Sequence, residues 1–169
     1  MIAPDVTRTD PPYVAGEREM LESWLDFHRA TLLRKCAGLG DEQLRQRACP
    51  PSTLSLLGLV RHMTEVEHSW FGRVVGEPGP WIYATEEWPD ADFDDLDKAD
   101  AVENFAAFER ECVRSRERAA TRQLDDTFVS RRGQTISLRW VYVHMIEEYA
   151  RHNGHADLIR EAIDGTTGY

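Results

Sequence analysis

The sequence has few cysteines, no long apolar run and no uninterrupted basic segment. Its three cysteines, Cys36, Cys49 and Cys112, show no CxxC spacing, which argues against a thiolate zinc site and indicates a reducing cytoplasm. No window is long and apolar enough to cross a membrane, and acidic residues and prolines interrupt the first residues before a signal peptide can form. We therefore expect a cytoplasmic protein with no membrane partner.

The charge balance is acidic. The 169 residues include 20 Lys and Arg against 30 Asp and Glu, a formal net charge of −10, which argues against nucleic acid or an anionic membrane as the main partner. Arginines at positions 114–122 are interleaved with Glu117 and preceded by Glu111, a pattern typical of a solvated helix face. The 41% hydrophobic content is that of an ordinary globular protein, and the length fits one domain.

Long amphipathic helices are predicted over about residues 16–39, 53–75, 98–122 and 137–163. In the first helix, the residues expected to face inward are Leu21, Trp24, Leu25, His28 and Leu32. In the third helix, they are Val102, Phe105, Phe108 and Cys112. Gly165 is expected to end the last helix in a left-handed conformation.

The connections between these helices indicate their arrangement. The links before residue 53 and over 123–135 are short and polar, whereas residues 76–97 form a long acidic connection that contains aromatic residues. This pattern predicts an all-α four-helix bundle with a long crossover between helices two and three. Residues 1–15 are expected to be a flexible N-terminal arm, residues 16–165 a single domain, and residues 166–169 a tail.

Two polar residues interrupt the apolar stripe of the last helix. Glu148 and His152 lie four positions apart and thus on one face. A carboxylate among core residues is costly unless it is paired, protonated or bound to a cation, and the histidine is a natural co-ligand. His62 on the second helix is placed to meet them across a bundle. Gly58, one turn before His62, leaves either space for a ligand or close packing of a neighbouring helix.

His62, Glu148 and His152 therefore form a candidate metal site. Two histidines and one carboxylate with an open position describe a catalytic zinc centre, and iron, nickel or manganese also suit the set.

Three further side chains flank this set. His144 lies one turn before Glu148, and His155 lies nearly two turns after it. Each is a candidate to replace Glu148, to orient a ligand or to act as a general acid or base, or is a plain helix-face histidine. Arg139, on the other flank, either binds a carboxylate of a substrate or cofactor or makes a surface salt bridge.

Three stretches of the chain, at residues 21–44, 52–71 and 137–164, resemble a known group of proteins. They are similar to the DinB-like superfamily of metal-binding four-helix proteins, especially the actinobacterial branch related to mycothiol-dependent maleylpyruvate isomerase. Members commonly hold a metal with one histidine of helix two and two residues one turn apart on helix four. The His, Glu, His pattern of the isomerase branch falls on His62, Glu148 and His152. Despite the superfamily name, the resemblance implies no DNA binding.

The resemblance implies metal-assisted thiol transfer, with mycothiol as the co-substrate thiol. A metal favours the thiolate, which would attack a small electrophile and give an S-conjugate or, by reversible addition, an isomerised product. His144 or His155 would move the proton, and the crossover would cover the pocket.

Two other functions remain open at this stage. The same site would serve a metal-dependent hydrolase by activating water, or the protein would be a non-catalytic metal-binding stress protein. A homodimer is suggested by family analogy alone.

Overall fold

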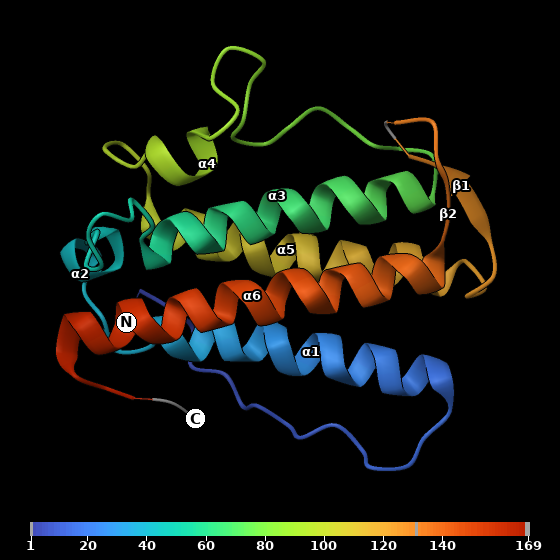
Figure 1. The fold of residues 1–169 in the computed structure, drawn as a ribbon, viewed down its shortest axis with the longest axis horizontal. Coiled ribbons are helices and arrows are strands. Elements are labelled where there is room, and N and C mark those ends of the chain that lie inside the picture. Colours follow the sequence, from blue (N-terminus) through green and yellow to red (C-terminus); the bar gives the residue numbers. More distant parts are fainter. Residues whose placement is uncertain (1, 131, 168–169) are drawn as a thin grey trace.

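In the computed structural model, which describes residues 2–130 and 132–167, the chain folds as a bundle of long helices (Figure 1). The long helices are α1 (Glu17–Cys36), α3 (Leu56–Val74), α5 (Ala101–Ala120) and α6 (Leu138–Asp164). The short elements are α2 (Asp41–Arg45), α4 (Ala91–Asp94) and the strands β1 (Thr127–Val129) and β2 (Thr135–Ser137). The predicted all-α fold is confirmed.

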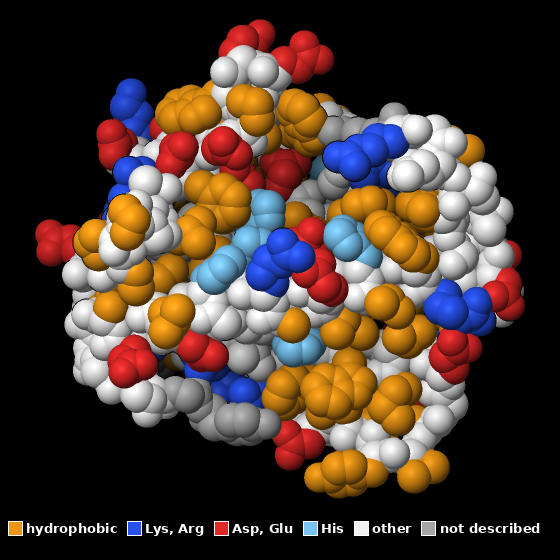
Figure 2. All heavy atoms as spheres, viewed as in Figure 1, with side chains coloured by type: hydrophobic (Ala, Val, Ile, Leu, Met, Phe, Trp, Pro, Cys, Tyr) orange, Lys and Arg blue, Asp and Glu red, His pale blue; other side chains and the backbone are white. Residues whose placement is uncertain are grey.

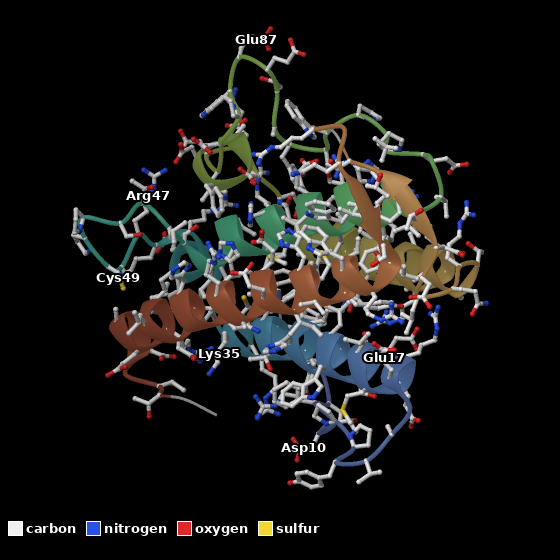
Figure 3. All side chains as sticks on the ribbon, turned by 45° about the vertical axis from the view of Figure 1, so that its right-hand side comes forward. Asp10, Glu17, Lys35, Arg47, Cys49 and Glu87 are labelled. Atoms are coloured by element: carbon white, nitrogen blue, oxygen red, sulfur yellow. The ribbon has the colours of Figure 1, made fainter. Side chains whose placement is uncertain are left out.

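The helices are arranged so that α3 and α6 run side by side in opposite directions on one face (Figure 1). α5 packs against α3, and α1 packs against α6. The long connection between α3 and α5 passes over α3 and contains α4, which packs on α3. Glu87 lies at the outer tip of this crossover, away from the bundle (Figure 3). The crossover therefore runs along α3, beside the face that α3 shares with α6.

Capping residues fix the ends of three helices. The side chains of Ser55, Asp100 and Ser137 accept hydrogen bonds from the first turns of α3, α5 and α6. Gly165 ends α6 with φ 76°, and its N–H donates to the carbonyl of Glu161. The expected left-handed cap is confirmed.

The polar connection before α6 contains an antiparallel hairpin that the sequence did not lead us to expect. Phe128 of β1 pairs with Ile136 of β2, and both side chains pack against the core. Gly133 adopts φ 74° in the turn. Each strand has only three residues, which is too short to show a clear alternation of apolar and polar side chains in the sequence. Tertiary packing stabilises them. Part of the expected 123–135 link falls on Arg131, which lies outside the described residues.

Two residues predicted to face inward are exposed. Trp24 is 42% exposed and Val102 is 60% exposed, so these predictions are wrong. The inner face of α1 instead includes Arg29, which is 5% exposed and lies between the buried Leu25 and Leu32. A pattern of hydrophobic residues does not reveal an arginine on the core face. The predicted apolar stripe of α1 is therefore rotated about the helix axis relative to the face that is buried.

Arg29 belongs to a buried polar network that joins three helices. Its Nε and Nη2 atoms each donate to a carboxylate oxygen of Glu67 at 2.7 Å, and the Tyr149 hydroxyl donates to the same carboxylate at 2.8 Å. The Glu67 side chain has no exposed surface. Burial, and then the charge of Glu67, raise the pKa of Tyr149 well above its usual value. The network links α1, α3 and α6 through matched charges and hydrogen bonds.

Replacing Glu67 by Leu is expected to lower the free energy of unfolding by about 3–5 kcal/mol, because Arg29 is left as an unpaired buried charge. The double variant Arg29→Met, Glu67→Leu should recover much of the loss. Urea denaturation followed by circular dichroism measures both. As a control, Glu103→Leu removes an exposed partner of Arg110 and should cost at most about 1 kcal/mol. Equal losses for the two single variants would contradict a special role for the buried pair.

The N-terminal arm has no regular secondary structure, yet its first residues pack on the bundle. Ala3 is 2% exposed, and the guanidinium of Arg8 lies 4.6 Å from the ring centroid of Phe27. Figure 3 shows Asp10 on the part of the arm that passes α1. Of the expected tail, residues 168–169 lie outside the described residues.

None of the described helices combines the length and apolar character that a bilayer crossing requires.

Candidate metal centre

The crossover is fixed to α3 by charged side chains that bind its backbone. Arg61 donates to the carbonyls of Asp92 and Ala91 at 2.9 and 3.0 Å. One turn further along α3, the carboxylate of Glu65 accepts from the backbone N–H groups of Ile82 and Tyr83 at 2.9 and 2.8 Å. The short helix α4 is thereby held in one position beside α3.

Gly58 allows the crossover to approach α3 closely. A Cβ atom at this position would lie 3.3 Å from the carbonyl oxygen of Phe93 and 3.4 Å from its Cα atom. Of the two reasons considered from the sequence, close packing of a neighbouring helix is confirmed, since Phe93 belongs to the short helix α4 of the crossover. Phe93 in turn stacks on the ring of His62, with centroids 4.4 Å apart.

The structure brings the three predicted ligands together. His62 on α3 and Glu148 and His152 on α6 each offer a ligand atom, and these atoms all lie within 4.8 Å of one another. Nε2 of His152 lies 3.6 Å from Oε2 of Glu148. Figure 2 shows histidine side chains gathered near the centre of this face, beside acidic and hydrophobic groups. The cluster lies at the surface seam of two antiparallel helices.

His62 is oriented by an acidic residue of the crossover. Its Nδ1 atom lies 2.8 Å from Oδ2 of Asp92, whose side chain is 6% exposed. A carboxylate accepts, so the histidine donates from Nδ1 and its Nε2 atom keeps a lone pair. Such a carboxylate–histidine pair is typical of metal ligands. Sequence reasoning missed Asp92, because a single Asp in a strongly acidic connection carries no distinguishing signal.

His152 has an equivalent partner in His155. Their Nδ1 atoms lie 3.4 Å apart, so one ring donates and the other accepts. Burial, followed by the charges of His152 and Arg151, lowers the pKa of His155, which keeps this ring neutral and able to accept. If His152 donates from Nδ1, its Nε2 atom is free to face Glu148. This geometry favours an orienting role for His155 among the roles left open above.

Glu148 is held in its charged form. Hydrogen bonding to His152 lowers its pKa, partial burial opposes this effect, and the charges of His144 and His62 add to the lowering. Its other oxygen, Oε1, lies 3.4 Å from Nε2 of His144. Contrary to the expected core position, the Glu148 side chain is 22% exposed. His144 therefore lies at the open edge of the cluster.

Arg139 is not brought to the cluster. Its Nε atom lies 2.6 Å from Oε1 of Glu17 on α1. Its Nη1 atom pairs with Asp125, in the connection before β1. Figure 3 shows Glu17 at the beginning of α1. The structure thus shows Arg139 in a salt-bridge pair, and ligand binding by this residue stays a prediction.

A cavity of about 690 Å³ lies elsewhere, between the N-terminal arm, α1 and α5. None of the predicted site residues lines it. Among the residues that the structure describes, groups that could hold a metal converge at the surface cluster and not at this cavity.

The donor set fits a divalent cation. Two imidazole nitrogens and a charged carboxylate are the ligands that zinc prefers, and two of the three carry an orienting partner. His144, Glu147 and Glu148 form a second group with converging ligand atoms, but Glu147 is paired with Arg151. The set His62, Glu148 and His152 is therefore the better candidate.

The fold and the cluster together define a DinB-like helical protein with a candidate metal centre. Comparison with protein families matches residues 20–165 to the mycothiol-S-transferase family. The chain belongs to this family of mycothiol-related transferases, as the resemblance of its helices implied. No curated protein and no solved structure matches the chain significantly.

The variant Asp92→Asn is expected to weaken zinc binding about 10- to 100-fold, since a neutral amide oxygen is a weaker acceptor for His62 than the carboxylate that orients it and carries no negative charge. Competition with a chromophoric chelator measures the affinity. Asp90→Asn is the matched control, because Asp90 precedes α4 and is exposed. Unchanged affinity in Asp92→Asn, or equal weakening in both variants, would show that Asp92 does not orient a ligand.

Proposed function

We propose that the protein is a metal-dependent transferase that joins the sulfur of mycothiol, or of a similar low-molecular-weight thiol, to a small electrophile. Reversible addition at the same site would make it an isomerase. Membership of the mycothiol-S-transferase family supports the thiol. The observation that carries the metal dependence is the convergence of His62, Glu148 and His152, whose ligand atoms lie within 4.8 Å of one another.

His62, Glu148 and His152 would hold the cation, with zinc as the first choice and nickel, iron or manganese as alternatives. A cation bound there favours the thiolate form of a coordinating thiol. Asp92 and His155 orient the two histidines. Phe93, stacked on His62, covers one side of the site and limits the access of water.

In the transfer, the thiol sulfur forms a bond to the electrophilic carbon, and the leaving group departs with the electron pair of the bond that breaks. The thiol proton needs an acceptor at the open edge of the cluster. His144 suits this role, because its Nε2 atom lies 3.4 Å from Glu148 and its side chain is 21% exposed.

Metal analysis is the first test. The purified protein is expected to bind one zinc ion per chain, and His62→Ala, Glu148→Gln and His152→Ala should each lose it while helical content stays unchanged. His68→Gln is the control, since His68 lies on α3 but contacts Glu111 and the carbonyl of Pro80. Full metal content in His62→Ala would refute the ligand assignment.

The cobalt-substituted protein then tests the thiol. Adding mycothiol should change the visible spectrum and give a sulfur-to-cobalt charge-transfer band, and conjugation of a small electrophile should depend on the same three residues. A protein that binds metal but shows no response to thiols, and that hydrolyses esters or amides instead, would contradict the transferase and favour the hydrolase.

A further inference from the structure

The seam between α3 and α6 extends beyond the candidate metal centre. Because residues four positions apart lie on one line along a helix, each helix presents a row of side chains to this seam. These rows are His62, Val66 and Trp70 on α3, and Trp140, His144, Glu148 and His152 on α6. The helices run in opposite directions, so the metal ligands gather at one end of the seam and two tryptophans at the other.

The two tryptophans and His144 form one aromatic cluster, which we call the tryptophan platform. The ring centroids of Trp70 and Trp140 are 5.3 Å apart, and His144 lies 4.7 Å from Trp70 and 4.8 Å from Trp140. Trp140 remains 44% exposed, and Val143 beside it is 55% exposed. The Arg73 guanidinium lies 5.2 Å from the ring centroid of Trp70, so Trp140 offers the exposed aromatic surface, which suits a flat ring in offset or edge-on contact.

The platform is within reach of a small molecule that reacts at the metal centre. Trp140 and Glu148 are eight positions apart on α6, which is about 12 Å along the axis, and His144 lies halfway between them. A ring lying against the outer side of the Trp140–His144 stack would therefore place its reactive carbon within about one helical turn of the cluster. A group bound on the platform would have His144 between it and Glu148.

The charged groups along this part of the seam already have partners in the protein. Arg139 binds Glu17, Arg151 binds Glu147, and Arg73 donates to Ser69. A ligand rich in hydroxyl groups would have to compete for them. A flat apolar ring would not have to compete for these charged groups. This favours the electrophile, rather than the polar part of a thiol, as the ligand of the tryptophan platform.

We propose that Trp140 and Trp70 bind the flat apolar part of the electrophilic co-substrate, so that the protein prefers aromatic electrophiles to small aliphatic ones. This inference rests on the proposed transferase function. For an activated aryl chloride, the thiol sulfur bonds to the ring carbon, the carbon–chlorine bond breaks, chloride leaves with the electron pair, and the thiol proton is released to water.

Steady-state kinetics with mycothiol and two electrophiles, 1-chloro-2,4-dinitrobenzene and iodoacetamide, tests the preference. Trp140→Ala should raise the KM for the aromatic probe roughly five- to tenfold, in line with the loss of an aromatic contact. Its kcat and the KM values for iodoacetamide and for mycothiol should stay within twofold of wild type. Trp140→Phe should restore most of the loss.

Trp24→Ala is the matched control, because Trp24 is similarly exposed but lies on α1, and it should change none of these constants. Equal changes for both electrophiles in Trp140→Ala would overturn the proposal, as would a change confined to the KM for mycothiol. A change of oligomeric state in Trp140→Ala, without an effect on the KM for the aromatic probe, would also overturn it.

A binding measurement separates this inference from the proposed function. The unreactive 2,4-dinitrotoluene is titrated into the metal-free protein, and the five tryptophan indole N–H signals are followed by NMR. The signals of Trp70 and Trp140, assigned with Phe variants, should shift, and Trp140→Ala should weaken the binding by a similar factor, roughly five- to tenfold. If these indole signals shift but the protein transfers no thiol, the proposed role of the platform is retained and the proposed transferase function is rejected. Transfer without shifts would reject the platform alone.

Discussion

The hydrogen bond between His62 and Asp92, at 2.8 Å, connects the two parts of the molecule on which the site depends. His62 belongs to a long helix of the bundle, whereas Asp92 belongs to the crossover. Arg61 and Glu65 support this bond by binding the crossover backbone, and Gly58 lets the crossover come close to α3. The crossover is thus a structural component of the candidate metal centre and supplies its orienting carboxylate.

Charged residues have opposite roles at the centre of the bundle and at its surface seam. In the centre, the Glu67 side chain is fully buried, and its charge is matched by Arg29 and the Tyr149 hydroxyl, which joins three helices. At the seam, Glu148 remains partly exposed and is surrounded by histidines. The rigid network in the core holds α3 and α6 in position, and the seam remains open for chemistry.

The seam places the two proposed subsites of the transferase at its two ends. Metal-binding groups gather at one end, where Phe93 covers His62, and the tryptophan platform lies at the other. His144 contacts both, since it stacks on Trp140 and lies 3.4 Å from Glu148. Two substrates that react with each other need adjacent but different subsites. The candidate metal centre, at which the thiol is proposed to bind, lies beside an aromatic surface and meets this need along one pair of helices.

The sequence by itself determined the long helices, the left-handed cap at Gly165 and the shared face of Glu148 and His152, because helical periodicity fixes which residues share a face. It made His62 a candidate to meet them in a bundle, and the structure brings the three together. The sequence misplaced Trp24 and Val102, and it gave no sign of the hairpin, of Asp92, or of the inward position of Arg29. These features depend on contacts between segments far apart in the chain. Only the tertiary structure pairs Arg29 with Glu67 and Asp92 with His62, since such polar pairs have no periodicity of their own.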